Sequence, residues 1–165
     1  MNVDALSYMH VKSSVQGAFL DDASRAGATK TLCLAVHFRG EVPHDVRKGS
    51  SYAVTQHKPI SVIREWSPST VQFLVAMWNN EVLDEVGFDF VRPNSEGMEE
   101  IYATLTLTNA TVAFVELRSG NTASLMETAP RAVDYIGFHA QTIEFKVMGP
   151  NGASTATYER KSSAS

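Results

Sequence analysis

The sequence has little of what marks a disulfide scaffold, a membrane protein or a nucleic-acid-binding protein. Its single cysteine, Cys33, cannot form a disulfide within the chain or a cysteine-rich zinc site. No apolar run approaches the length of about 18 residues that a membrane-spanning helix needs. The net charge is -4, and no cluster of Lys and Arg is present to neutralise phosphates. We therefore expect no membrane insertion and no nucleic-acid partner.

Signals for classical export and for catalysis are also missing. The N-terminus, MNVDALSYMHVKSSVQGAFL, has no positively charged start before an unbroken apolar run, so we expect no cleaved signal peptide. Glu99 and Glu100 are adjacent and would point to opposite faces of a strand, which does not suit paired acid catalysis. The histidines form neither His-x-His nor H-E-x-x-H. Cys33 lies in the apolar run TLCLAV and reads as a buried thiol. We predict no enzyme activity, cofactor or metal site.

What the sequence does have is alternation of apolar and other residues, which is typical of half-buried antiparallel strands. The hydrophobic share of 44% over 165 residues is enough for the core of one domain. We predict a mainly β domain over residues 1–148 and a Ser/Ala/Thr-rich, partly disordered tail over 149–165. The run TLCLAVHF, apolar on both faces, predicts a central strand. The alternating runs are 60–66, 85–92, 101–108, 110–117, 133–140 and 141–148.

One segment, 67–80, has the period of a helix instead. Ser67 suits the N-cap and Pro68 the first helical position, and Asn79-Asn80 can end the helix. The helical spacing predicts an apolar stripe that packs into the core against Phe88 and Phe90. The residues of that stripe are Val71, Leu74, Val75 and Trp78.

A turn and a long loop complete the pattern. The stretch 93–97, PNSEG, predicts the tip of a hairpin, because Pro93 presets a turn and Gly97 tolerates a positive φ. The segment Arg39–Tyr52 is long for a connection and mixes both charges with apolar residues. Connections of such length are usually functional or disordered.

Several of these residues stand in an order that resembles the Hcp family, the tube proteins of type VI secretion systems. The resemblance covers roughly Tyr52 to Val147, and the closing run VDYIGFHAQTIEFKV looks like the last strands of that family. The matching motifs are His57-Lys58-Pro59, Ser67-Pro68, Arg92-Pro93, Gly97, Glu99-Glu100, Tyr102 to Thr104, Asn109-Ala110 and Phe138 to Gln141.

The resemblance implies a two-sheet antiparallel β-barrel with one short α-helix. It also implies a structural role: six copies form a ring with an open channel, rings stack into a tube inside a sheath, and the tube is exported. Sheath, spike and effector proteins would be its partners. The protein would be cytoplasmic during assembly and then secreted without a cleaved signal peptide.

Within that reading we expect the Arg39–Tyr52 loop to form the contact between stacked rings, with a solvated loop as the alternative. The residues assigned to this contact are Arg39, Glu41, Val42, Val46, Arg47 and Lys48. Two other functions remain open from the sequence. One is a tail-tube protein of a phage-type injection machine, and the other is a carbohydrate-binding or cupin-like β-barrel.

Overall fold

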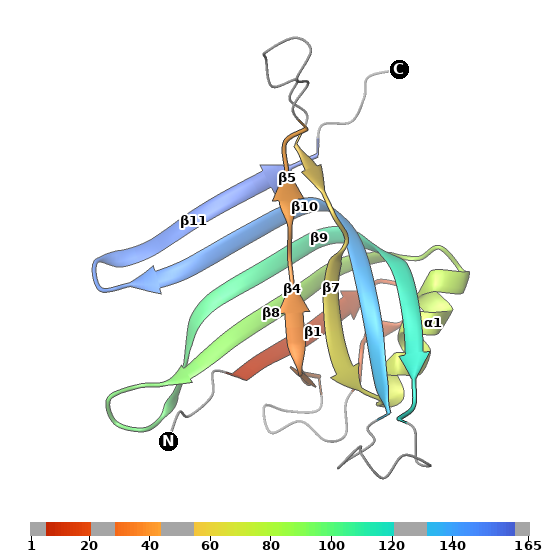
Figure 1. Ribbon diagram of the computed structural model, residues 1–165, viewed down its shortest axis with the longest axis horizontal. Helices are drawn as coiled ribbons and strands as arrows, with labels where there is room; N and C mark the ends of the chain where they lie inside the picture. The colour runs from red at the N-terminus through yellow and green to blue at the C-terminus, as the bar shows by residue number, and fades with distance from the viewer. Residues whose placement is uncertain (1–5, 21–28, 44–54, 121–131, 161–165) are drawn as a thin grey trace.

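The computed structural model describes residues 6–20, 29–43, 55–120 and 132–160, which form a strongly curved antiparallel sheet with one helix beside it (Figure 1). The helix is α1, Pro68–Trp78. The strands are β1 Leu6–Ser13, β2 Gly17–Ala18, β3 Thr31–Cys33, β4 Ala35–His37, β5 Gly40–Glu41, β6 Gln56–His57, β7 Ile60–Glu65, β8 Val82–Pro93, β9 Glu99–Arg118, β10 Val133–Gly149 and β11 Gly152–Glu159.

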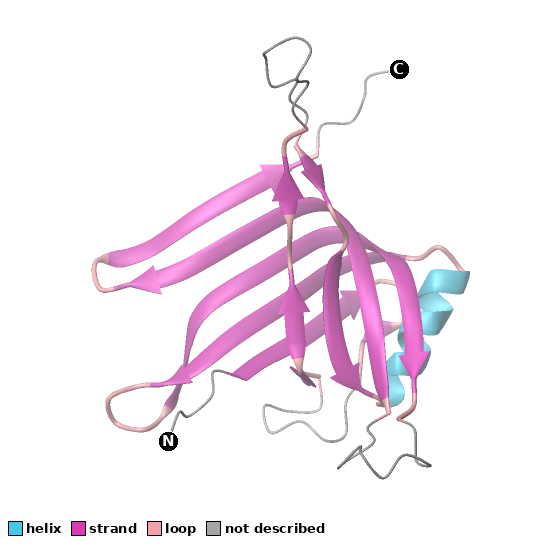
Figure 2. Cartoon of the chain, in the orientation of Figure 1, coloured by secondary structure: helices cyan, strands magenta, loops and turns pink. Residues whose placement is uncertain are grey.

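Nine of these strands form one sheet, in the order β2-β1-β8-β9-β10-β7-β4, with β3 added to β1 and β11 added to β10. Strands β5 and β6 form a separate two-stranded ribbon. The prediction of a mainly β, two-sheet fold with one helix is confirmed. The large sheet is strongly curved (Figure 2), and buried side chains of β7 pack in one cluster with those of β1 and β8. Its end strands β2 and β4 do not pair, so the described strands form no closed barrel.

The core lies inside this curl and is dominated by aromatic and branched side chains. Phe88 on β8, Phe138 on β10 and Phe73 on α1 are fully buried. Phe138 contacts both other rings edge-on, with centroid distances of 5.7 Å to Phe73 and 6.5 Å to Phe88. Edge-to-face pairs of this kind add to the area that the rings bury. The alternation predicted for β9 is confirmed, since Ala103, Leu105 and Leu107 are buried.

The predicted hairpin tip is also confirmed. Asn94 accepts hydrogen bonds on its side-chain oxygen from the backbone N–H groups of Glu96 and Met98, both at 2.9 Å. Gly97 has a φ of 79°, which a residue without a side chain adopts at little cost. Glu99 and Glu100 then open β9 as exposed residues. The acids therefore belong to a solvated strand start, as their adjacency predicts.

The helix forms where expected, but its buried face was predicted wrongly. Ser67 is extended, Pro68 begins the helix, and Asn80 follows its end with a φ of 50°. Trp78 is 72% exposed and Val71 62% exposed, whereas Phe73 and Ala76 are fully buried. The buried face also contains Ser69 and Thr70. Because two of its residues carry hydroxyl groups, this face is not found by looking for apolar residues at helical spacing. The polar contacts that bury these two residues are described below.

The run TLCLAVHF is not a central strand. It breaks at Leu34 into β3, which pairs with β1, and β4, which pairs with β7 at an end of the sheet. Leu32, Leu34 and Phe38 remain exposed. Apolar residues on both faces of a run indicate a strand, but they do not indicate whether neighbouring strands pair with both of its edges.

Much of the predicted C-terminal tail forms a strand. Gly149 and Gly152 pair across a tight turn, and β11 then follows β10 as far as the pair Thr142 and Glu159. Gly152 has a φ of 115°, which the turn requires. The Ser/Ala/Thr-rich composition suggested disorder, but alternating β-branched threonines also suit a strand once a neighbour supplies hydrogen bonds. Of the predicted tail, residues 161–165 lie outside the described part.

Candidate functional site

The most deeply buried polar group in the described chain is an ion pair between neighbouring strands. Arg64 on β7 and Asp134 on β10 are opposite each other in the strand register, and neither is exposed to solvent. The Arg64 guanidinium donates from Nε to Oδ1 at 3.1 Å and from Nη2 to Oδ2 at 2.6 Å. This two-point geometry is the strongest that the two groups can form.

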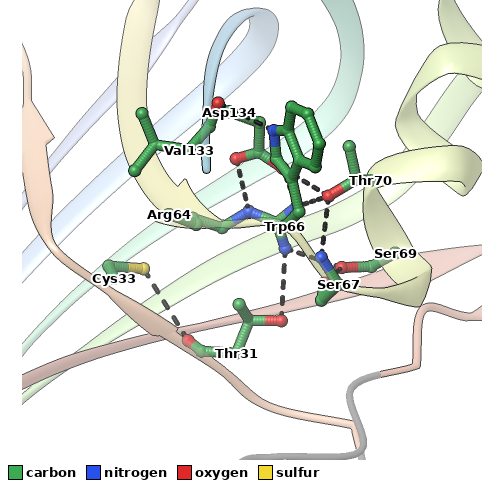
Figure 3. Close-up of polar contacts among 9 residues, drawn as sticks. All are labelled: Thr31, Cys33, Arg64, Trp66, Ser67, Ser69, Thr70, Val133 and Asp134. Carbon is green, nitrogen blue, oxygen red and sulfur yellow. Dashed lines mark hydrogen bonds and ion pairs between the residues drawn. The ribbon is translucent and has the colours of Figure 1, made fainter. Parts of the chain in front are cut away.

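Three hydroxyl groups complete the network, which Figure 3 shows in close-up. Thr70 donates to Asp134 Oδ2 at 2.6 Å, and Arg64 Nη1 donates to Ser69 Oγ at 2.6 Å and to Thr31 Oγ1 at 3.3 Å. The guanidinium carbon also lies 4.9 Å from the centre of the Phe73 ring. The network therefore ties β3, β7 and β10 to the first turn of α1 and fixes which face of the helix is buried.

This network was not predicted from the sequence, although the sequence contains a signal for it. Arg64 lies at alternate positions with Ile60 and Val62, and Asp134 lies two residues before Ile136. A lone cation on one apolar strand face and a lone anion on another predict a buried pair, because an unpaired charge there would be too costly. Neither charge is accessible, so the pair holds the fold together and does not act on a ligand.

Cys33 lies beside the network, and its thiol has low reactivity. Burial raises the pKa of the Cys33 thiol to about 12, and the positive charge of Arg64 offsets only part of that effect. Thiol Sγ is 3.8 Å from the carbonyl oxygen of Thr31. The thiolate, which is the nucleophilic form, is therefore scarce at neutral pH.

Part of the proposed stacking loop is visible in the β5–β6 ribbon. Glu41 on β5 forms ion pairs with Arg39 at 3.3 Å and with Lys58 at 3.5 Å. Val42 follows and is half exposed. The ribbon thus presents a small charged cluster beside an exposed apolar residue. The other predicted contact residues, Val46, Arg47 and Lys48, lie outside the described residues.

An aromatic stack attaches this ribbon to the end of the large sheet. His57 on β6 stacks on Phe38 with a centroid distance of 5.5 Å and meets Tyr158 of β11 edge-on at 4.2 Å. Gly40 lies across from His57, and a Cβ there would be only 3.0 Å from His57 Nδ1. The ribbon that bears Glu41 is thereby held close to β11, so the start of the loop has a fixed base.

Over the described ranges, no three His, Cys, Asp or Glu side chains come together as a potential metal site. In the same residues, no helix has the length and apolar character needed to cross a membrane. The geometry in hand is that of a scaffold with exposed strands and exposed apolar side chains, which can support contacts with other proteins.

The whole fold resembles solved Hcp structures. One, a crystal structure of an Hcp protein, has a TM-score of 0.84 and 18% identity and covers 96% of this chain and 100% of its own. Hcp1 from E. coli EAEC 042, in a doubly substituted form, gives a TM-score of 0.78 and 14% identity, covering 93% and 98%. The secreted protein Hcp3 from Pseudomonas aeruginosa gives 0.71 and 16%, covering 96% and 100%. At such identities these matches show the shared fold.

The sequence itself settles the family. A search of curated proteins finds no match. The family described as type VI secretion system effector, Hcp, matches residues 8–147, which is most of the chain and extends across the N-terminal strands. The chain belongs to the Hcp family of type VI secretion proteins.

Proposed function

We propose that this protein is a subunit of the inner tube of a type VI secretion system, in which six copies close into a ring and rings stack. The observation that carries this proposal is the family match over residues 8–147, together with an Hcp fold that extends over nearly the whole chain. No observation on the described residues favours a phage-type tail tube or a cupin-like barrel.

The surface chemistry suits a repeating assembly. On β9, Thr104 and Thr106 alternate with the buried Leu105 and Leu107, so one strand has a core face and an uncharged polar face. Only 19% of the residues are charged. Removing water from such an uncharged face costs little free energy. In a closed ring, a face of this kind can be buried in the head-to-tail contacts between copies.

Light scattering on the purified full-length chain tests the ring. Six copies of an 18.0 kDa chain give about 108 kDa, and the mass should be reached without metal or nucleotide. A monodisperse species of 18.0 kDa at micromolar concentration would contradict the proposal.

For stacking, we assign the contact to the loop that begins at the β5–β6 ribbon: Arg39, Glu41, Val42, Val46, Arg47 and Lys48. Charges of both signs around a small apolar centre suit a contact whose affinity is low for one loop. The affinity becomes high when the contact is repeated around a ring. Replacing Val42, Val46 and Arg47 together by Ser should abolish tubes and leave single rings intact. The matched control is Val15→Ser, which alters a valine that is 75% exposed in another turn. Unchanged tubes, or loss of the ring itself, would refute this assignment.

Assembly in the cytoplasm would then be followed by export with the tube, in contact with sheath, spike and effector proteins. Mass spectrometry of the protein recovered from culture medium tests the route. We expect the exported chain to have the same N-terminus as the chain recovered from the cells. A chain shortened by a signal-peptide cleavage would contradict it.

A further inference from the structure

Helix α1 exposes an apolar stripe that the monomer leaves uncovered. We call Val71, Leu74, Val75 and Trp78 the helix stripe. Trp78 and Val71 are mostly exposed, and Leu74 and Val75 are partly buried. The stripe has the i, i+3, i+4, i+7 spacing of a packed helix face, yet the buried face of α1 is a different one. A contiguous exposed apolar surface of this kind usually marks a contact site.

A second apolar surface lies where the sheet extends beyond the core. By strand alternation, Phe145 and Val147 on β10 continue the face of the buried Ile143, and Ile101 on β9 continues the face of the buried Ala103. The register pairs Phe145 with Leu105 and Val147 with Ala103, so these side chains are neighbours. We call Ile101, Phe145 and Val147 the arm surface. Each is between 37% and 44% exposed.

The two surfaces lie at opposite ends of the molecule. In Figure 1 the longest axis is horizontal, α1 lies at its right end, and the hairpin turns of β8–β9 and β10–β11 lie at its left end. A head-to-tail ring needs two different surfaces on each copy, placed so that one meets the other on the next copy. This chain presents such a pair of surfaces.

Their electrostatics and size also match. Helix α1 carries no charged residue. The face of β11 that adjoins Phe145 and Val147 is uncharged too, with Ala156 opposite Phe145 and Ser154 opposite Val147. Contact between α1 and this part of the arm would therefore bury no charge from either element. Trp78 and Phe145 alone would bury about 200 Å², given their exposed fractions and a full aromatic burial of about 150–250 Å². That is a sizeable centre for an interface of about 800 Å² per partner.

We propose that within the ring the helix stripe of one copy packs against the arm surface of the next copy, with Trp78 as the central anchor. This inference rests on the proposed ring but goes beyond it, because it assigns the two faces that meet. Tryptophan is one of the side chains enriched among the residues that contribute most of an interface's binding energy. The contact also explains why the helix has regularly spaced apolar residues on a face that its own chain leaves exposed.

Cysteine cross-linking tests the contact directly. Full-length Val71→Cys and Val147→Cys proteins, which both keep the Trp78 anchor, are mixed, allowed to reassemble and oxidised mildly. An intermolecular disulfide should form between the two variants, and the double variant should give a ladder of up to six linked chains. Unsubstituted protein is the control, since its only thiol, that of Cys33, is buried. Tyr102→Cys in place of Val147→Cys, on the opposite face of the sheet, should not cross-link to Val71→Cys.

Substitution gives an independent measurement. Val71→Ser with Trp78→Ser should shift the light-scattering mass from six chains towards one while the circular dichroism spectrum and the denaturation midpoint of the single chain are kept. Leu34→Ser, which alters an exposed leucine on the edge of the sheet, should remain hexameric. If the Val71→Ser/Trp78→Ser protein still forms rings and the Val71→Cys and Val147→Cys proteins give no disulfide, this contact is overturned and the ring proposal stands. An unsubstituted chain that stays monomeric overturns the ring, and this contact with it.

Discussion

Removing Asp134 should be among the most damaging single changes in this protein. Asp134→Ala leaves the guanidinium of Arg64 buried with only hydroxyl partners and takes from Thr70 the acceptor at 2.6 Å. Breaking a buried ion pair from one side typically costs about 3–5 kcal/mol. The expected loss here lies in that range, because both side chains are fully buried and the pair is bidentate.

The comparison variant is the double change Arg64→Met with Asp134→Leu, which removes both charges at similar volume. It should recover most of the loss, since apolar replacements of buried pairs are often neutral or stabilising by about 1–4 kcal/mol. Urea titrations of all three proteins at one protein concentration measure the effect. With a slope of about 2 kcal/mol per molar, Asp134→Ala should lower the midpoint by about 2 M. A shift below about 0.5 M, or a double variant no more stable than the single one, would show that the ion pair does not have this role.

Three further outcomes follow from the packing. Phe73→Ala should cost about 3–5 kcal/mol by denaturant titration, whereas Trp78→Ala should cost the single chain under about 0.5 kcal/mol. Gly137→Ala should destabilise by about 1–3 kcal/mol, because a Cβ there would be 2.2 Å from the ring of Phe114. Since burial raises the pKa of Cys33 to about 12, maleimide should label it only on unfolding, and its contribution to stability should be full below pH 9 and lost towards pH 12.

Alternation and turn chemistry predict the middle of the chain well. The β8–β9 hairpin follows from Pro93, Asn94 and Gly97, whose backbone preferences act over a few residues and need no distant partner. The helix bounds follow from Ser67-Pro68 and Asn80 for the same reason. These features are local, so the sequence alone specifies them.

The errors share a different cause, which is that the partner lies far away in the sequence. Ser69 and Thr70 are buried because Arg64 and Asp134 meet beneath them, and no helical count contains that pairing. β11 is a strand because β10 supplies its hydrogen bonds. The helical spacing predicts that the face with Trp78 is covered, but it does not indicate whether the same chain or another protein covers it.

The functional assignments, too, could be predicted from the sequence only in part. Family resemblance predicts a ring subunit, and the family match over residues 8–147 supports it. The described structure places Arg39, Glu41 and Val42 at the ribbon but does not test their role in stacking. The apolar arm at Phe145 and Val147 could not be foreseen, because an alternating strand gives no sign of where the core beneath it ends.

Negative-stain electron microscopy of the full-length protein shows directly whether this chain closes into rings. We expect annular particles with six-fold symmetry and a central channel, formed without added metal, nucleotide or partner protein. A field of compact particles without a channel, at concentrations where the chain is folded, would contradict it.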